Sequence, residues 1–375
     1  MQNAEVVIVG AGIVGSALAY GLARTGCRVL VLDGEDLDFR AARANFGLVW
    51  VQGKGPGMPA YQHLTRDSSD LWPAFHAELC ETAATAVDYE RKGGLYFCIG
   101  EDGFEARRQA LHRLHNQPAA AADDCEMLDR RQLEGLMPAV PFGPEVTGAS
   151  YCWRDGHVNP LQLLQALHRA TEKLGGAVLS GQTVTRIEAG TLGFQVTTAK
   201  GVFGADRLVI AAGVASGDLA RQVGLDVPVR PQRGQILVTE RMAPWLPLPA
   251  SGLRQTSEGT IMIGATQEEV GFDTGTTVEK AGFLARKALR VIPRLAEARL
   301  VRQWSGLRVM TPDSYPLYAQ SESHPGAFVL LCHSGVTLAA AHAGVVAAAV
   351  ASGQLSESLT SFHHRRFLKD VRQAV

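Results

Sequence analysis

Three glycines near the start of the chain are spaced as in a phosphate-binding turn. Gly10, Gly12 and Gly15 follow four apolar residues typical of a buried strand, and they open a helix of small residues. Glycines at this spacing allow a tight turn, a close approach of the backbone to a pyrophosphate, and close packing of the helix on the strand. Free N–H groups and a partial positive charge at the start of that helix favour phosphate.

A carboxylate stands where a ribose could be recognised. Asp33 ends a second apolar run, 29–32, and comes eighteen residues after Gly15. At this place it can accept hydrogen bonds from ribose hydroxyls. A glycine-rich turn that binds nothing does not account for Asp33. Strand, helix, strand and acid together therefore predict an adenine dinucleotide, although the glycine pattern alone does not choose between NAD and FAD.

The elements that must position this turn are spread along the whole chain. Apolar patterns predict strands at 6–9, 29–32, 177–179, 184–187, 193–198, 205–213, 259–264 and 328–331, and helices at 161–174 and 337–351. The dinucleotide-binding fold is thus expected to come from the start, middle and end of the chain, with a second domain inserted between these pieces. A substrate pocket is expected between the two domains.

Composition and charge are those of an ordinary globular protein. The 375 residues are 46% hydrophobic and 19% charged, and the net charge of −1 argues against nucleic acid or an anionic membrane as the main partner. Six scattered cysteines without a CxxC pattern fit a reducing compartment and predict no metal site built by this chain alone. No transmembrane segment or signal peptide is predicted, so a cytoplasmic location is expected, or one peripheral to a membrane through partners. We expect a surface loop at 118–124 and the solvated end of a terminal helix at 363–366.

Later segments suggest which dinucleotide is bound, through a resemblance to a known family. Three segments resemble parts of the D-amino-acid oxidase, glycine oxidase and sarcosine oxidase superfamily. Segment 205–213 resembles its strand and turn, segment 304–313 its GLRPxTxD segment, and segment 332–338 its flavin-contacting turn. Segment 43–47 also matches its flavin loop, segment 231–235 the start of its substrate domain, and segment 264–268 its GxT-E turn. The chain is identified as a member of this superfamily over essentially its whole length.

The resemblance implies an α/β fold in two parts. One is a GR2-type FAD-binding, Rossmann-like domain with a parallel central sheet, expected at 1–85, 146–218 and 305–375. The other is an inserted α+β substrate domain on a mostly antiparallel sheet, expected at 86–145 and 219–304.

The resemblance also implies FAD as the cofactor. It is expected to be non-covalent, because no cysteine stands near Gly306, where monomeric sarcosine oxidases attach their flavin. The residues expected to bind FAD are Gly10, Gly12, Ile13, Val14, Gly15, Asp33, Gly34, Arg43, Ala44, Asn45, Gly47, Leu48, Val184, Ala211, Gly213, Gly306, Gly335, Val336, Thr337 and Leu338.

Two residues are candidates for catalysis. Arg308 aligns with the arginine that holds the substrate carboxylate in the family, and a guanidinium offers a bidentate, permanently charged fork for that task. A structural ion pair with Asp313 is the alternative. His333 could hydrogen-bond flavin or substrate, and a purely structural histidine is the alternative.

Four further residues are candidates for the substrate pocket. Trp50 and Gln52 could face the substrate from the flavin loop, and a buried core position is the alternative for Trp50. Arg254 and Gln255 lie in the region where relatives place an aromatic substrate contact, but this chain has no tyrosine there, and a solvated loop is the favoured interpretation for both.

The run 42–55 and the turn 332–338 most resemble the FAD-bearing subunits of heteromeric opine and D-hydroxyproline dehydrogenases, with relatives in hydrogen cyanide synthase. The implied reaction is oxidation of the C–N bond of an amino or imino acid. A hydride passes to the flavin, and water hydrolyses the imine. The implied partners are other subunits of a dehydrogenase complex, and a second flavin or an iron–sulfur centre on those subunits is left open.

Oxygen chemistry separates two versions of this function. Met262 stands where sarcosine oxidases carry a lysine that activates oxygen, so poor reaction with O2 is expected. A stand-alone glycine or D-amino-acid oxidase that uses O2 is the alternative. From another class, the chain could be a flavin electron-transfer subunit whose catalytic centre lies on a partner. An NAD-dependent dehydrogenase leaves the later motifs unexplained.

Overall fold

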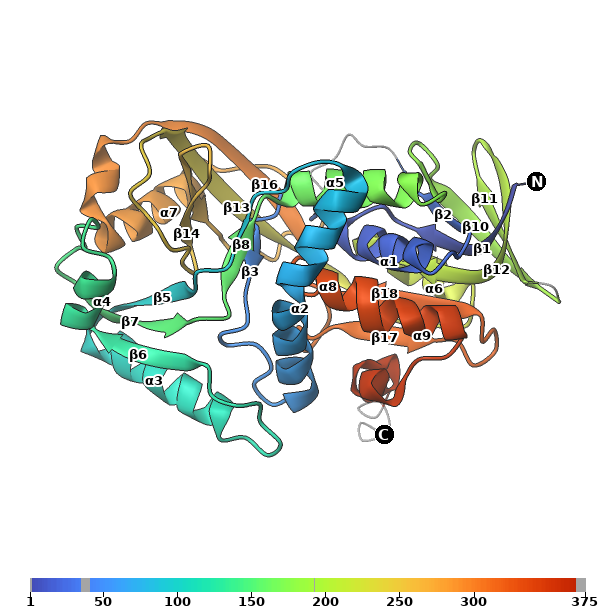
Figure 1. Cartoon of the computed structure of the whole chain (residues 1–375), viewed down its shortest axis with the longest axis horizontal. Helices are drawn as coiled ribbons and strands as arrows, with labels where there is room; N and C mark the ends of the chain where they lie inside the picture. The colour runs from blue at the N-terminus through green and yellow to red at the C-terminus, as the bar shows by residue number, and fades with distance from the viewer. Residues whose placement is uncertain (1, 35–40, 192, 369–375) are drawn as a thin grey trace.

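The computed structural model describes residues 2–34, 41–191 and 193–368. Figure 1 shows two halves side by side, one around β1 and β12 near the N-terminus and the other around β5, β7 and β14, with α2 between them. The α-helices of the described residues are α1 Ile13–Arg24, α2 Pro59–Ala83, α3 Gly100–His115, α4 Arg130–Leu136, α5 Pro160–Lys173, α6 Ser216–Arg221, α7 Val278–Val291, α8 Ala339–Ala341 and α9 Ala347–Ser352.

The first half is built on an eight-stranded sheet, the main sheet. Its strands are β1 Gln2–Val9, β2 Val29–Leu32, β9 Ala177–Leu179, β10 Val184–Gly190, β11 Gly193–Thr198, β12 Gly201–Ile210, β17 Leu317–Gln320 and β18 Ala327–Leu331. The order β10-β11-β12-β1-β2-β9 is extended by β18, which pairs with β12 and with β17. Strands β1, β2, β9, β12 and β18 run parallel, which confirms a parallel core assembled from the start, middle and end of the chain.

The two faces of the main sheet are covered differently because side chains alternate along β1. Val6 and Ile8 pack with Leu18 of α1 in one apolar cluster. Val7 and Val9 point the other way and pack with side chains of β10, β11 and α6. All four β1 side chains are buried, as expected for a central parallel strand with both faces covered.

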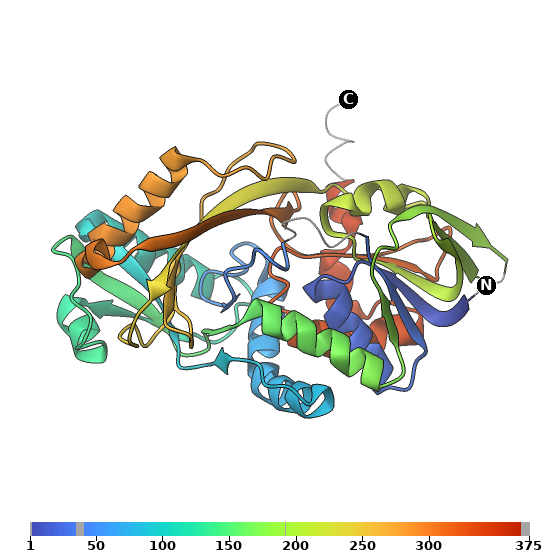
Figure 2. The ribbon, with the colours of Figure 1, turned by 90° about the horizontal axis from the view of Figure 1, so that it is seen from above.

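The second half is built on antiparallel sheets. A four-stranded sheet has the order β14-β15-β13-β16, and three-stranded sheets have the orders β5-β7-β6 and β3-β8-β4. The bounds are β3 Leu48–Val49, β4 Tyr89–Glu90, β5 Gly94–Ile99, β6 Cys125–Asp129, β7 Val146–Cys152, β8 Gly156–Val158, β13 Arg230–Arg241, β14 Leu253–Gln255, β15 Thr260–Gly264 and β16 Leu300–Met310. Figure 2 shows the long strands β13 and β16 reaching from this half toward the main sheet.

The predicted domain boundaries stay a prediction, and two segments bear on them. The strand β7, assigned to the FAD-binding domain, pairs with β5 and β6 of the other half. Residues 305–310, also assigned to that domain, are part of β16 and pair with β13. Both segments therefore pair with strands of the antiparallel half.

The last predicted helix, 337–351, was wrong at its start and in its geometry. The helix begins at Ala339, and residues His342–Val346 form a π-helical turn between α8 and α9. Ser68 of α2 causes the late start. Its hydroxyl donates to the Thr337 carbonyl at 2.8 Å and accepts the Ala341 N–H at 3.2 Å, so it replaces a direct helical bond between the two.

The basic run at 363–366 was also misjudged, because it is not the solvated end of a helix. Residues His364–Phe367 form a 3₁₀ turn, and His364 is buried. Arg366 pairs with Asp313, with 2.6 Å between Nε and Oδ2. Among the described residues no single helix is long and apolar enough to cross a membrane. The segments 339–352 and 357–367 reach that length only together, and they meet at 105°.

His342 in the π-helical turn makes stability depend on pH. Its ring is fully buried, and burial lowers its pKa from 6.5 to about 3. Because the folded pKa lies below the unfolded one, the associated stability is complete above about pH 6.5 and is lost as the pH falls toward 3. We expect His342→Gln to reduce the slope of the unfolding free energy against pH, between pH 6 and 4, by about 1.4 kcal/mol per pH unit.

Urea unfolding of the FAD-saturated protein at several pH values measures this slope. Tyr318→Phe is the matched control, because Tyr318 shares a hydrogen bond of 2.9 Å with His342 Nε2 but does not titrate in this range. It should lower stability at every pH and keep the slope. An unchanged slope in His342→Gln would show that this ring is not a neutral buried base.

Candidate active site

Two cavities meet where the main sheet approaches the antiparallel half. The β1–α1 cavity, of about 540 Å³, follows the glycine turn, Asp33 and the ends of β12 and β18. The Arg308 cavity, of about 230 Å³, lies between the flavin loop 41–48 and the facing parts of β13 and β16. The two cavities adjoin, and they share the lining residues Ala41, Asn45, Leu307, Val309, Cys332, His333 and Val336.

The three glycines of the turn have different structural reasons. A Cβ on Gly10, which has φ +109°, would lie 2.4 Å from the Ala211 carbonyl oxygen, and a Cβ on Gly15 would lie 2.0 Å from the Gly10 oxygen. Protein packing therefore requires both. A Cβ on Gly12 would have Ala42 at 3.9 Å as its nearest neighbour and would project toward the cavity that Gly12 lines. The free space at Gly12 suits a ligand that approaches the backbone.

Asp33 and the start of α1 lie together on this cavity. Asp33 Oδ2 accepts the Ala11 N–H at 2.5 Å, and Gly12, at the N-cap of α1, has no side chain to cap the helix. Free helical N–H groups beside an open cavity attract phosphate, and the Asp33 carboxylate can accept hydroxyl hydrogen bonds. The cradle therefore fits an adenine dinucleotide such as FAD.

Most of the residues predicted to bind FAD line one of the two cavities. Those on the β1–α1 cavity are Gly10, Gly12, Ile13, Val14, Asp33, Gly34, Asn45, Val184, Ala211, Gly213, Gly335 and Val336. Those on the Arg308 cavity are Ala44, Asn45, Leu48, Gly306, Val336 and Thr337. Gly15, Arg43, Gly47 and Leu338 line neither. Leu338 is fully buried in the core, and Gly47, at φ +85°, supports the bend of the flavin loop.

Arg254 supports the flavin loop from the antiparallel half. The expectation of a solvated loop was wrong, because Arg254 and Gln255 are buried residues of β14. Arg254 Nε donates to the Phe46 carbonyl at 2.5 Å, and Nη1 lies 3.0 Å from His157 Nδ1. Burial lowers the pKa of Arg254 to about 10. Arg254 itself does not line the Arg308 cavity, but the Phe46 that it holds does.

Gln52 and Gln255 also lie outside the residues that line the cavities. The Gln52 side chain donates to Asp155 Oδ2 at 2.7 Å and to the Gly94 carbonyl at 3.0 Å. Gln255 Oε1 accepts the N–H groups of Trp245 and Leu246. Both amides satisfy backbone and side-chain groups inside the protein.

Arg308 lines the cavity named after it and is not paired with Asp313. The predicted alternative was wrong, because Asp313 binds Arg366 instead. The Arg308 side chain crosses β13 at Gly234, where a Cβ would lie 2.6 Å from the guanidinium. Within the described residues, the Arg308 side chain makes one hydrogen bond, and this bond is long, with 3.4 Å between Nη1 and the Arg233 carbonyl oxygen. The fork can therefore bind a carboxylate from the cavity.

Trp50, His333 and Cys332 complete the wall between the two halves. The Trp50 side chain is buried and lines the Arg308 cavity, and its backbone N–H donates to Thr337 Oγ1 at 3.1 Å. Desolvation lowers the pKa of His333 to about 3, with repulsion from Lys54 and Arg308 added, so the ring is neutral at ordinary pH. Burial raises the pKa of the Cys332 thiol to about 12.

A comparison with protein families shows which family this chain belongs to. Residues 5–349 match the model of the DAO family, described as FAD dependent oxidoreductase. The chain is a DAO-family FAD-dependent oxidoreductase.

Individual relatives of this DAO-family chain are named as subunits or as an oxidase. It is 42% identical to one of the opine oxidase subunits of Agrobacterium tumefaciens over 98% of both chains. It is 31% identical to hydrogen cyanide synthase subunit HcnC of Pseudomonas aeruginosa over 84% of both. Its fold matches the crystal structure of glycine oxidase from Geobacillus kaustophilus with a TM-score of 0.86 at 24% identity, covering 97% of this chain and 99% of that one.

Sequence reasoning missed Lys54 in the wall of the DAO-family site. Lys54 lines the Arg308 cavity, and its ammonium donates to Ser334 Oγ at 2.8 Å. The sequence pattern that could have indicated Lys54 is its position between Gly53 and Gly55, a few residues after the flavin loop. Both glycines have positive φ, 84° and 87°, so the chain turns sharply on either side of Lys54. Phe46, Ile236 and Ala265 were missed as well, and they are apolar wall residues.

One group of possible metal ligands lies elsewhere. His115, Asp124 and Cys125 bring ligand atoms within 4.8 Å of one another, which the sequence spacing did not indicate. Asp124 already faces Arg66 at 2.8 Å and Arg154 at 3.1 Å, and these two cations oppose a metal ion. That this chain builds no metal site by itself stays a prediction.

Proposed function

We propose that this enzyme oxidises the C–N bond of an amino or imino acid of the opine or D-hydroxyproline type. The observation that carries the proposal is Arg308, a partly buried guanidinium without a carboxylate partner among the described residues, in a cavity that adjoins the β1–α1 cavity. The similarity of the chain to a subunit of opine oxidase supports this substrate class. A carboxylate anchor has no role in pure electron transfer, which weakens the alternative of a non-catalytic flavin subunit.

The protein residues supply orientation and a controlled environment. FAD, when bound, would accept the hydride released as the C–N bond becomes an imine, which water then hydrolyses. Arg308 would hold the α-carboxylate by a bidentate contact and so fix the α-carbon. Phe46 and Trp50 would exclude water. The neutral His333 ring would offer a hydrogen bond without adding another positive charge.

The cofactor site is proposed to hold FAD non-covalently. Gly12 and the start of α1 would bind the pyrophosphate, and Asp33 the ribose. Cys332 is the one cysteine among the described residues that line the two cavities, and its raised pKa opposes the thiolate that covalent attachment would need.

We further propose that the chain works as one subunit of a dehydrogenase complex. Two relatives support this, because one is named as a subunit of opine oxidase and the other, HcnC, as a subunit of hydrogen cyanide synthase. A second flavin or an iron–sulfur centre would then lie on partner subunits. A cytoplasmic location, or one at the membrane through partners, belongs to the same proposal.

Anaerobic mixing of the FAD-loaded protein with candidate substrates tests the function. The panel contains opines, D-hydroxyproline, D-proline, glycine and sarcosine, and the readout is bleaching of the oxidised flavin band. We expect bleaching by secondary-amine or imino acids and slow recovery in air, because Met262, a buried apolar residue of β15, stands where sarcosine oxidases carry the lysine that activates O2. Fast recovery with peroxide release would favour the oxidase alternative. A bound flavin that no panel member bleaches would contradict the proposed reaction for this chain alone.

A further inference from the structure

The Arg308 cavity contains a second cation that the proposed carboxylate anchor does not explain. Lys54 and Arg308 both line this cavity of about 230 Å³, and burial together with the positive charge of Arg308 lowers the pKa of Lys54, so an anion beside Lys54 would stabilise its charged form. They come from different parts of the fold. Lys54 follows β3 of the three-stranded sheet β3-β8-β4, whereas Arg308 lies on β16 of the four-stranded sheet.

No carboxylate of the described residues neutralises either cation by an ion pair. The negative charge of Glu268 raises the pKa of Arg308, but Glu268 itself is bound to Arg233 at 2.8 Å and to Gln235 at 2.9 Å. The charge of Asp155 raises the pKa of Lys54, but Asp155 already accepts hydrogen bonds from the Val51 N–H at 2.6 Å and from the Gln52 amide at 2.7 Å.

The other titratable groups in the wall carry no compensating negative charge. His333 is neutral at ordinary pH, and the Cys332 thiol keeps its proton because burial raises its pKa to about 12. Two cations in a confined site without an anion are unfavourable unless a ligand supplies the negative charge. Two anionic groups on the ligand would match the two cations.

Both cations also have hydrogen-bond donors to spare. The Lys54 ammonium has three donors, and Ser334 Oγ, which also accepts from Tyr61 at 2.6 Å, takes one of them. Arg308 has five donors and a single long bond to the Arg233 carbonyl within the described residues. Each can therefore receive a carboxylate without breaking a strong bond in the protein.

We propose that Lys54 binds a second substrate carboxylate, and that the site takes secondary amines carrying a carboxylate on each side of the nitrogen. Arg308 holds one carboxylate, Lys54 holds the other, and the C–N–C unit lies between them. This inference rests on the proposed oxidation of a C–N bond and narrows it. Opines built from an amino acid and a 2-oxo acid have two such carboxylates, whereas D-hydroxyproline, glycine and sarcosine have one and leave one cation uncompensated.

A binding experiment tests this without turnover. Oxydiacetate and methoxyacetate are ethers that mimic iminodiacetate and sarcosine but carry no oxidisable C–N bond. Their dissociation constants for the FAD-loaded protein can be measured by calorimetry and by perturbation of the flavin spectrum. We expect oxydiacetate to bind about 50-fold more tightly than methoxyacetate in the wild type, and this preference to vanish in Lys54→Met.

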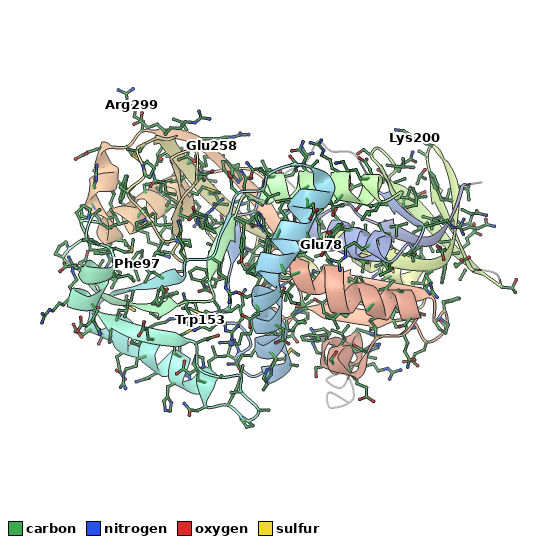
Figure 3. All side chains as sticks on the ribbon, in the orientation of Figure 1. Glu78, Phe97, Trp153, Lys200, Glu258 and Arg299 are labelled. Carbon is green, nitrogen blue, oxygen red and sulfur yellow. The ribbon has the colours of Figure 1, made fainter. Side chains whose placement is uncertain are left out.

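Lys54→Arg and Lys200→Met complete the set of variants. Lys54→Arg keeps the charge and should restore most of the preference for the dicarboxylate. Lys200 is exposed in the turn between β11 and β12, at the outer end of the main sheet (Figure 3), so Lys200→Met should bind both ligands as the wild type does. In turnover, Lys54→Met should raise the KM for iminodiacetate about 50-fold and change the KM for sarcosine little.

The outcomes separate this inference from the proposed function. Equal binding of the two ethers by the wild type overturns the role of Lys54, whether or not the Lys54 variants fold. Equal losses of affinity for both ethers in Lys54→Met would assign Lys54 to structural support through Ser334, and would also overturn its role as a carboxylate-binding residue. If iminodiacetate, sarcosine and the opines all fail to bleach the flavin while oxydiacetate keeps its preference, the proposed reaction fails and the dicarboxylate site stands.

Discussion

Replacing Arg308 with methionine should nearly abolish reduction of the bound flavin by substrate. The variant loses the one guanidinium that the described residues leave without a carboxylate partner in the Arg308 cavity. A charged, bidentate contact in a confined site is worth several kcal/mol, so we expect kcat/KM to fall about 1,000-fold. Arg308→Lys should recover part of this loss, because an ammonium keeps the charge but not the fork. Anaerobic stopped-flow measurement of flavin bleaching gives both values.

The matched control for Arg308 lies on the same strand. Arg302 is an exposed residue of β16, and its guanidinium stacks over the Trp304 ring instead of lining the cavity. Arg302→Met should reduce flavin at the wild-type rate. FAD content should be unchanged in all variants, because the proposed pyrophosphate and ribose contacts lie on the β1–α1 cavity, which Arg308 does not line. Wild-type bleaching in Arg308→Met would revive the alternative of an electron-transfer subunit whose catalytic centre lies on a partner.

The main sheet was predictable because its signals are local. Continuous apolar runs such as 29–32 mark strands buried on both faces, and the glycine turn carries its own backbone requirements within six residues. The β1–α1 cavity follows from these elements, because the carboxyl ends of parallel strands meet at one edge of the sheet. Residues of that edge, such as Gly10 and Gly213, therefore line one cavity, and their contact with FAD stays a prediction.

Features that depend on distant contacts could not be predicted in the same way. Arg254 and Gln255 are polar, so their sequence favours exposure, but the Phe46 carbonyl and the backbone of the 242–246 loop satisfy them inside the protein. The start of the last helix is set by Ser68, 269 residues before the Thr337 carbonyl that it binds. Lys54 is directed by Ser334, which is 280 residues away. None of these contacts leaves a pattern in the residues nearby.

Gly12→Ala should weaken FAD binding and leave the folded apoprotein almost as stable as the wild type. Gly12 has φ −71°, which alanine adopts readily, and the new methyl would meet no protein atom of the described residues closer than 3.9 Å. That methyl would instead occupy the space that the proposed pyrophosphate needs. Overpacking of a rigid contact costs about 1–3 kcal/mol, so we expect the dissociation constant for FAD to rise about 5- to 150-fold. Fluorescence titration of the apoprotein with FAD measures it.

Gly15→Ala gives the opposite signature and makes the comparison decisive. Its methyl would lie 2.0 Å from the Gly10 carbonyl oxygen and 3.3 Å from Ile8, so helix α1 must move away from β1. The apoprotein itself should therefore lose stability, as seen in a lower unfolding midpoint before any FAD is added. Wild-type affinity for FAD in Gly12→Ala would mean that no ligand approaches this turn. Equal destabilisation of both apoproteins would mean that packing alone requires Gly12, and that its place on the cavity carries no functional information.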